Sequence, residues 1–234
     1  MHKKLSLVVG VILGMPLIAL GAPVFSYQQA QSVIPVSSTD LVDMSQPSYG
    51  GSTSAGFTSY DDGSGASSPA ILNDGSGGTY GVHSVQTAVT TQNTPWTLTY
   101  TLAGSATGYD ITGVNISSLW NTDYVDQDYQ VAFAPATNLT NFTPYATEIA
   151  NNTTGQPGED IQSSLTDDTG FLAKNVGAIQ FTFSPDSTDA YGHQAAYTEV
   201  DVLGMASPTP EPASIGMLLA GGMVVLVRRR GRRG

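Results

Sequence analysis

The feature that most restricts the fold of this chain is a two-residue alternation near its middle. From Trp96 to Leu102 every second residue is apolar or aromatic, and each residue between them is Thr. A period of two is typical of a β-strand that has one buried face and one face toward solvent. No window of the body combines a 3.6-residue period with helix-capping residues, so we do not expect helices there.

Other stretches of the body show strand patterns. In 198–204 the alternation places Val200 and Val202 toward the core and Glu199 and Asp201 toward solvent. Short strands between loops rich in Gly, Asn, Asp and Pro are typical of an antiparallel β-sandwich. We therefore expect an all-β sandwich whose remaining strands lie at 109–116, 129–133 and 178–183.

The charge of the chain is divided between its body and its ends. Between Pro23 and Ser207 there are 18 acidic residues and one basic residue, Lys174, a net charge of 18 − 1 = 17 negative. Such a body repels phosphate backbones, which excludes nucleic-acid binding. The absence of cysteine excludes a disulfide scaffold, a thiolate metal site and a Cys nucleophile.

The N-terminal end has the organisation of a secretory signal peptide. Two lysines precede an apolar stretch over 5–20, and the small residues Ala19, Gly21 and Ala22 follow at its end. We expect a signal helix over 1–22 that is cleaved after Gly21 or after Ala22. An uncleaved N-terminal anchor is the alternative, because the apolar run is close to membrane-spanning length.

The C-terminal end combines three parts. Pro210, Glu211 and Pro212 precede an apolar run over 213–227, and an arginine cluster that includes Arg228, Arg229 and Arg230 ends the chain. The apolar run predicts a short transmembrane helix, and the arginines are expected on the cytoplasmic side.

This tail, over 206–234, resembles the PEP-CTERM sorting signal of bacterial exported proteins, which is also catalogued as an ice-binding-protein C-terminal domain. The resemblance implies recognition and processing by an exosortase-type membrane enzyme. The resemblance implies the location to which the protein is sorted and leaves the function of the body open. An ordinary tail anchor is the alternative.

The body divides into two parts. Residues 23–68 are rich in Ser, Thr, Gly and Pro and are expected to be irregular, with Ser32–Val36 as a candidate edge strand. The sandwich domain is expected over 69–205. Its order of motifs resembles the galactose-binding-like, discoidin-type jelly roll of carbohydrate-binding modules, and the matching stretches are Ala70–Gly75, Trp96–Leu102, Ile111–Trp120, Tyr129–Phe133 and Thr198–Gly204.

Two Asp-rich loops offer hard oxygen ligands of the kind that Ca²⁺ accepts. The first contains Asn73 and Asp74, and the second contains Asp123, Asp126 and Asp128; a solvated turn is the alternative for each. The jelly-roll resemblance implies a structural Ca²⁺ beside the first loop. By the same resemblance, Glu199 would complete its ligands if the last strand lies next to that loop.

The sequence contains no motif of an enzyme. It lacks a Gly-x-Ser-x-Gly elbow, a P-loop and a His-Glu-x-x-His zinc helix. We therefore expect a non-catalytic, exported protein of the cell surface or extracellular matrix that binds polysaccharide. The alternatives are a secreted carbohydrate-active enzyme and an ice-binding protein that presents the row Thr97, Thr99 and Thr101. The aromatic residues Trp120, Tyr124 and Tyr129 would either stack on sugar rings or fill the core.

Overall fold

The structure is a computed structural model, and the part of the chain that it describes consists entirely of strands and the segments that join them. It describes residues 21–38, 40–43, 49–53, 58–60, 72–77, 84–86, 95–120, 126–150, 159–184 and 196–209. These residues contain eleven β-strands and no α-helix, as the sequence analysis predicts for the body. No helix of the described part has the length and hydropathy needed to cross a bilayer. The expected signal helix and the tail helix lie outside the described residues.

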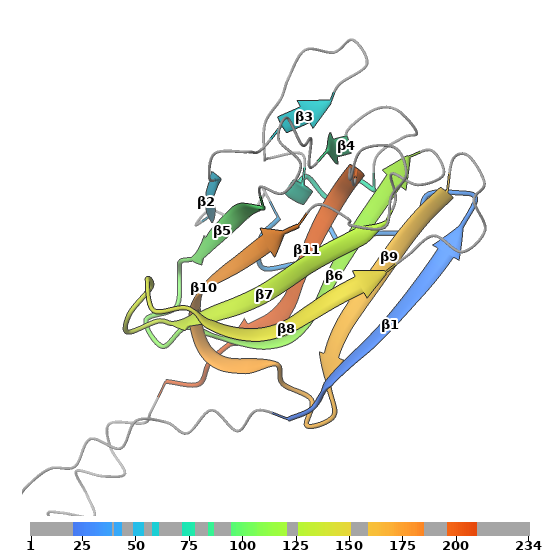
Figure 1. Cartoon of the computed structure of the whole chain (residues 1–234). Helices are drawn as coiled ribbons and strands as arrows, with labels where there is room; N and C mark the ends of the chain where they lie inside the picture. Colours follow the sequence, from blue (N-terminus) through green and yellow to red (C-terminus); the bar gives the residue numbers. More distant parts are fainter. Residues whose placement is uncertain are drawn as a thin grey trace, which may run out of the picture.

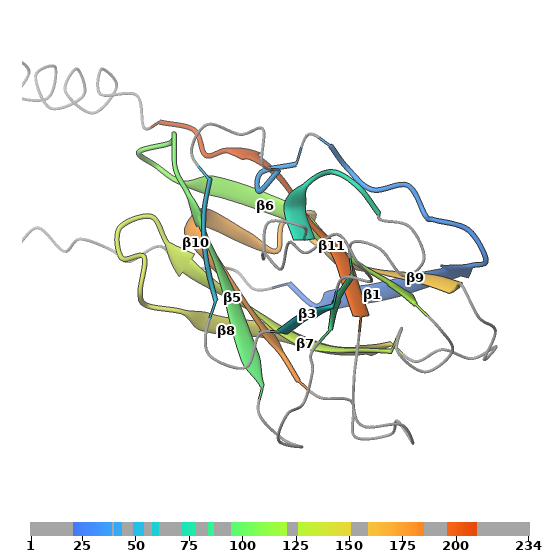
Figure 2. The ribbon, with the colours of Figure 1, turned by 90° about the horizontal axis from the view of Figure 1, so that it is seen from above.

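The strands form one hydrogen-bonded, antiparallel sheet that is folded into two facing layers (Figures 1 and 2). The first layer has the order β1-β9-β6-β11-β4-β3, with strands Pro23–Ala30, Glu159–Asp167, Tyr109–Trp120, Ala196–Ala206, Ser84–Gln86 and Thr58–Tyr60. The second layer has the order β2-β5-β10-β7-β8, with strands Tyr49–Thr53, Trp96–Leu102, Ala173–Phe183, Gln127–Pro135 and Thr143–Ala150. The expected β-sandwich is therefore present.

Strand β10 belongs to both layers. Its first residues, Ala173 and Val176, pair with β6, and its later residues pair with β5 and β7. The strand turns from one layer to the other around Asn175, which has a left-handed backbone with φ of 56°. At Gly177 a side chain would lie 2.5 Å from the Ala136 Cα, so the strand approaches β7 closely only because this residue has no Cβ.

Side chains from both layers fill the space between them. In β5 the apolar residues are buried and the threonines are half-buried, which confirms the alternation predicted from Trp96 to Leu102. Trp96 stacks on Phe183 with 4.4 Å between ring centroids, and Phe183 is also 4.4 Å from Tyr197 of β11. Aromatic side chains of this size supply a large share of the apolar area in a small core.

Strands β1, β2 and β3 lie within the segment that was expected to be irregular. Strand β1 pairs with β9 along its whole length, whereas Ser32–Val36, the candidate edge strand, has no regular structure. The prediction of an edge strand at Ser32–Val36 was therefore wrong, because the edge strand lies just before it at Pro23–Ala30. Most side chains of β1 are exposed because it is an edge strand, so its sequence lacks the marked alternation of a half-buried strand.

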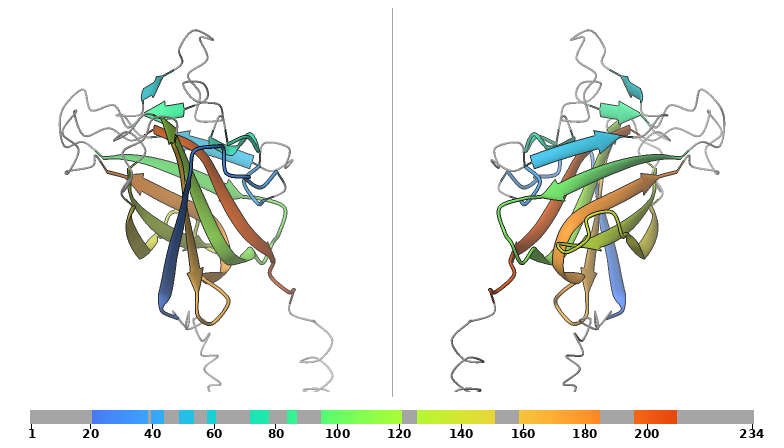
Figure 3. Two further views of the ribbon diagram at one scale, coloured as in Figure 1. Left: turned by 90° about the vertical axis from the view of Figure 1, so that its right-hand side faces the viewer. Right: turned by 90° about the vertical axis from the view of Figure 1, so that its left-hand side faces the viewer.

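Both ends of the body lie at the same pole of the sandwich, which we call the terminal pole (Figure 3). The first residue of β1, Pro23, pairs with Asp167 at the end of β9, and the last residue of β11, Ala206, pairs with Tyr109 at the start of β6. The amide of Ser207 then donates to the Gly108 carbonyl at 2.9 Å. The chain therefore enters and leaves the domain at one end.

The core assignment of β11 can be tested with two Asp substitutions on that strand. Val200 is fully buried in the core, whereas 58% of the Met205 surface is exposed. We expect Val200→Asp to lower the free energy of unfolding by about 3 kcal/mol or more, because it brings an unpaired charge among apolar groups. Met205→Asp is the control and should change it by about 0.5 kcal/mol or less. Thermal unfolding followed by circular dichroism measures both, and equal effects would contradict the assignment.

Candidate metal centre

A segment without regular structure crosses the outer face of the first layer. We call residues 31–43 the strap, of which the structure describes all but residue 39. Its backbone donors reach carboxylates of the strands below: the Ile34 amide donates to Asp160 Oδ2 of β9, and the Ser37 amide donates to Asp201 Oδ2 of β11 at 3.0 Å. A segment that has no strand partner must satisfy its buried N–H groups in this way.

The strap and the loop over 72–77 cover two acidic residues that were expected to face solvent: the Ser37 amide donates to Asp201, and the Gly75 amide donates to Glu199. Glu199 and Asp201 each expose only 1% of their surface. They do point away from the apolar core, as the alternation predicts, but the face onto which they point is covered. The prediction that Glu199 and Asp201 are solvent-exposed was therefore wrong, because a period of two distinguishes the two faces of a strand and cannot tell whether another segment covers the outer one.

The loop over 72–77 contacts both the strap and β11. The Asn73 side-chain amide donates to the Val42 carbonyl at 2.6 Å, and the Gly75 amide donates to Glu199 Oε1 at 3.2 Å. Gly75 has a φ of +73°, and a side chain there would meet Ser38 at 3.1 Å. The loop, the strap and the last strand thus meet at one place, so the condition under which the sequence analysis included Glu199 with Asn73 is met.

Asp74 lies at the exposed side of this loop. Its Oδ1 accepts a hydrogen bond from the Ser76 amide at 2.9 Å, which is the geometry of an Asx-turn. Its charge is nevertheless felt by Glu199, whose pKa it helps to raise.

The acidic residues of this site repel one another. Burial, and to a lesser degree the charges of Asp201, Asp74 and Asp40, raise the pKa of Glu199 to about 9. Burial raises the pKa of Asp201 to about 6, and it also raises the pKa of Asp40 above its ordinary value. Carboxyl groups shifted in this direction are costly to ionise, and a nearby cation would remove that cost.

Several oxygens of the site fit a hard cation. Asn73 Oδ1, Glu199 Oε2 and Asp40 Oδ2 are buried and have no hydrogen-bond donor among the described residues. Ca²⁺ accepts such amide and carboxylate oxygens together with backbone carbonyls. Within the described ranges, no group of three or more His, Cys, Asp or Glu side chains is arranged to hold a metal ion. A Ca²⁺ site here would therefore need the Asn73 amide oxygen and backbone carbonyls in addition to the carboxylates.

Sequence reasoning missed the strap's contribution to this site. Asp40 and Asp43 are almost fully buried, and Asp40 Oδ1 accepts from the amides of Val42 and Val202. Both residues fall within the segment that was assigned as irregular. The signal that could have identified them is the pair of acids, Asp40 and Asp43, around two apolar residues, Leu41 and Val42, because a solvated linker has no need of those apolar residues.

The other candidate residues lie in the core, in the sheet or outside the described residues. Tyr129 is fully buried, and its Oη lies 2.7 Å from Ser163 Oγ, so it belongs to the core and cannot stack on a sugar. In the Thr row, Thr99 Oγ1 accepts a hydrogen bond from Gln180 at 3.1 Å. Asp126, in the second Asp-rich loop, is buried. The side chains of Trp120, Asp123 and Tyr124 and the tail residues Pro210, Glu211, Pro212, Arg228, Arg229 and Arg230 lie outside the described residues.

Comparisons with known proteins give structural neighbours only. No protein-family model matches the chain, and no curated protein matches it. A CBM32 domain from Clostridium perfringens, in complex with GalNAc-β-1,3-galactose, is similar at 15% identity and a TM-score of 0.44, over 70% of this chain and 99% of that one. A family 32 carbohydrate-binding module of NanJ from the same organism, in complex with galactose, is similar at 14% identity and a TM-score of 0.42, over 70% and 97%. The C-terminal domain of a Bacteroides fragilis chitobiase is similar at 11% identity and a TM-score of 0.43, over 73% and 100%. Similarity of this degree does not extend to a ligand or to the residues of a site.

The contact between the strap and Asp160 predicts an unusual dependence of stability on pH. Burial raises the pKa of Asp160 to about 6, against about 3.9 in an unfolded chain. The folded state therefore holds the Asp160 proton more tightly than the unfolded chain does. The contribution of this proton to the free energy of unfolding is complete below about pH 3.9 and is lost as the pH rises through about 6.

Asp160→Asn removes this titration and keeps an oxygen that can accept from the Ile34 amide. At about pH 8 we expect the free energy of unfolding of the variant to exceed that of the wild type by about 1.4 kcal/mol for each unit between the folded and unfolded pKa of Asp160. At about pH 4 we expect the two free energies to be nearly equal. Urea unfolding at the two pH values measures the difference. A difference that is the same at both values would contradict the role of Asp160.

Proposed function

We propose that this protein is an exported, non-catalytic β-sandwich that is displayed at the cell surface or in the extracellular matrix through its C-terminal tail. The observation that carries this proposal is the order of Pro210-Glu211-Pro212, a short apolar run and a terminal arginine cluster in the sequence. This order resembles the PEP-CTERM sorting signal, and a short apolar run followed by basic residues is the pattern of a membrane helix with its arginines on the cytoplasmic side.

The position of the two ends of the body supports this arrangement. Thr209, the last described residue, directly precedes Pro210, and β11 ends at the terminal pole (Figure 3). A membrane tether that begins at Pro210 would therefore hold the terminal pole toward the membrane. The opposite pole would face outward, where a surface protein meets its ligands.

We further propose that the ligand is a polysaccharide, which is what the resemblance of the sequence motifs implies. The charge of the body restricts the class. With 18 acidic residues and one basic residue between Pro23 and Ser207, the domain repels polyanions. A neutral or basic polysaccharide is therefore the preferred ligand. A secreted carbohydrate-active enzyme and an ice-binding protein remain the alternative functions, and the experiment below separates them.

The same proposal includes a structural Ca²⁺ at the meeting point of the strap, the 72–77 loop and β11. Glu199 and Asn73 would hold it through buried oxygens, and Asp74 and Asp40 would contribute charge. The ion would supply positive charge to a place where burial raises the pKa of three carboxyl groups, and it would tie the strap to the sandwich.

Calcium should therefore raise the melting temperature of the protein. We expect about 1 mM Ca²⁺ to do so by preferential binding to the folded state, and Asp74→Ala and Glu199→Gln each to remove most of the increase. Differential scanning calorimetry of the full chain in detergent measures the effect.

Two controls distinguish a site from general screening. Mg²⁺ at equal ionic strength should have a smaller effect, because it requires a tighter octahedral shell. Asp128→Asn removes one charge at the start of β7 and should leave the response to Ca²⁺ intact. Equal responses to the two ions, or an unchanged response in both site variants, would show that the 72–77 loop is a plain turn.

Export and ligand class can be tested on the same preparation. We expect protein expressed with an exosortase-type enzyme to reach the cell surface with an intact mass that lacks Arg228, Arg229 and Arg230. This protein should be retained by a neutral galactan or by chitosan and should pass through alginate, a polyanion. It should not release reducing sugars from any of the three, and it should produce no thermal hysteresis.

The outcomes are separable. A surface protein that keeps both termini would show that the tail is an ordinary anchor. Release of reducing sugars would replace the binding function with a hydrolase, and thermal hysteresis would replace it with ice binding. Retention on alginate alone, in the absence of divalent cations, would contradict the charge argument.

A further inference from the structure

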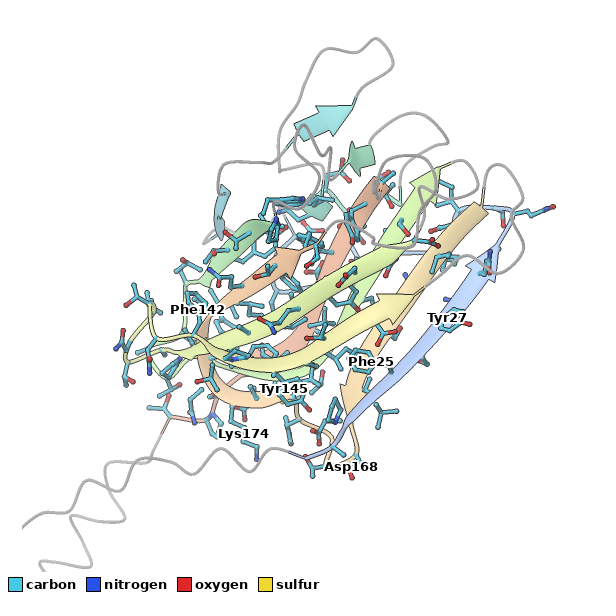
Figure 4. The ribbon with its side chains drawn as sticks, viewed as in Figure 1. Phe25, Tyr27, Phe142, Tyr145, Asp168 and Lys174 are labelled. Carbon is cyan, nitrogen blue, oxygen red and sulfur yellow. The ribbon has the colours of Figure 1, made fainter. Side chains whose placement is uncertain are left out.

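The chain enters the sandwich through a two-sided contact with the turn that follows β9. The Ala22 amide donates to Asp168 Oδ1 at 3.1 Å, and the Asp168 amide donates to the Ala22 carbonyl at 3.4 Å. Figure 4 shows Asp168 at the terminal pole, beside the start of β1. This contact lies one residue before β1 and fixes the position of the Ala22 nitrogen against a carboxylate.

The neighbouring carboxylate holds this turn in place. Asp167 Oδ1 accepts from the Thr169 amide at 2.7 Å, and its Oδ2 accepts from the Tyr145 hydroxyl of β8. Burial tends to raise the pKa of Asp167, but these hydrogen bonds outweigh that effect, so the pKa lies below its ordinary value. Two adjacent carboxylates, one fixed by the turn and one directed at Ala22, thus face the entry of the chain.

Gly21 is crowded against the first of these carboxylates. A side chain at position 21 would meet Asp167 Oδ1 at 2.0 Å, so no larger residue fits there without a shift. Gly21 is also one of the two residues after which the sequence permits signal-peptide cleavage. The structure distinguishes the two possibilities, because cleavage after Ala22 would remove the nitrogen and the carbonyl that bind Asp168, whereas cleavage after Gly21 keeps both.

The small-residue rule favours the same bond. Signal peptidases prefer small residues at the first and third positions before the cut. A cut after Gly21 places Gly21 and Ala19 at these positions, whereas a cut after Ala22 places Leu20 at the third.

We propose that Asp168, with Asp167 beside it, is a binding site for the processed N-terminus of this protein, formed when the Gly21–Ala22 peptide bond is hydrolysed. Water is the co-reactant: Gly21 leaves with a carboxylate, and Ala22 keeps a new ammonium group. The ammonium replaces a neutral amide as the donor to Asp168 Oδ1. This inference rests on the proposed export of the protein.

The charges around the site favour this ammonium. Lys174 is the only Lys or Arg between Pro23 and Ser207, and its Nζ lies 4.4 Å from the Phe171 ring centroid. The ammonium of Ala22 would be the second cation of a strongly acidic body. The ammonium adds a Coulombic attraction to the carboxylate that the neutral amide lacks, so cleavage should strengthen the entry of β1 into the sheet.

The test compares one protein before and after a cut. Residues 22–234 are fused behind a removable partner whose protease cuts directly before Ala22, and the sample is studied in detergent. The N-terminal amine is labelled by ¹³C reductive methylation and titrated by NMR. We expect its pKa to rise from about 8 to about 8.5–9 through its carboxylate neighbours. We expect the cut to raise the melting temperature by about 1 to 4 °C at low salt.

Two Asn variants control this test. Asp168→Asn should return the amine to about pKa 8 and remove the gain in melting temperature. Asp128→Asn, at the start of β7, should preserve the raised amine pKa and the gain in melting temperature. An amine pKa that is equal in the wild type and in Asp168→Asn, or a cut that leaves the melting temperature unchanged, would overturn the proposal.

Processing and export are read separately, from the N-terminal sequence and the location of protein recovered from the producing cells. A first residue of Ala22 supports the cleavage site, and a first residue of Pro23 or retention of Met1 overturns it. Absence of the protein from the cell surface contradicts the proposed export, while the titration of the cut fusion still decides whether Asp168 binds an ammonium.

Discussion

The fold depends on a single strand that satisfies its backbone hydrogen bonds in two layers. Strand β10 pairs with β6 through Ala173 and Val176, with β7 through Val176 and 178–183, and with β5 through 178–183. A buried strand that lost either set of partners would leave donors and acceptors without water or protein to bind them. The left-handed backbone of Asn175 and the missing side chain of Gly177 allow the strand to change layers without such a loss.

The acidic character of the body has its largest energetic effect on the covered face of the first layer. There the Ile34 and Ser37 amides of the strap donate to Asp160 and Asp201, and the Gly75 amide of the 72–77 loop donates to Glu199. Those donors fix the strap, but each contributes only part of a charge, so burial still raises the pKa of all three carboxyl groups. The proposed cation at the place where the strap, the 72–77 loop and the last strand meet would lower the cost of ionising Glu199 and Asp201.

The sequence predicts the interior of this protein better than its exterior. The strict alternation from Trp96 to Leu102 reflects one buried and one half-buried face, and it is reproduced in β5. Strand β1 was missed because an edge strand buries few side chains. Glu199 was wrongly predicted to be exposed because the Gly75 amide that donates to it lies 124 residues away along the chain, and no local pattern records that contact. The approach of Glu199 to the 72–77 loop entered the sequence analysis only as a condition, because residues 124 positions apart share no local pattern.

The common exit of both chain ends has a mechanical consequence. Strand β11 runs from the pole opposite the terminal pole, here called the outward pole, to the terminal pole. It is hydrogen-bonded to β6 along most of its length. A pull between the membrane and a load held at the outward pole would act parallel to this strand. Because ladder hydrogen bonds lie across the strand direction, such a pull loads them together in shear and does not open them one after another. The same ladder peeled from its end would give way bond by bond at lower force, so attachment through the C-terminal tail would itself make the domain resistant to tension.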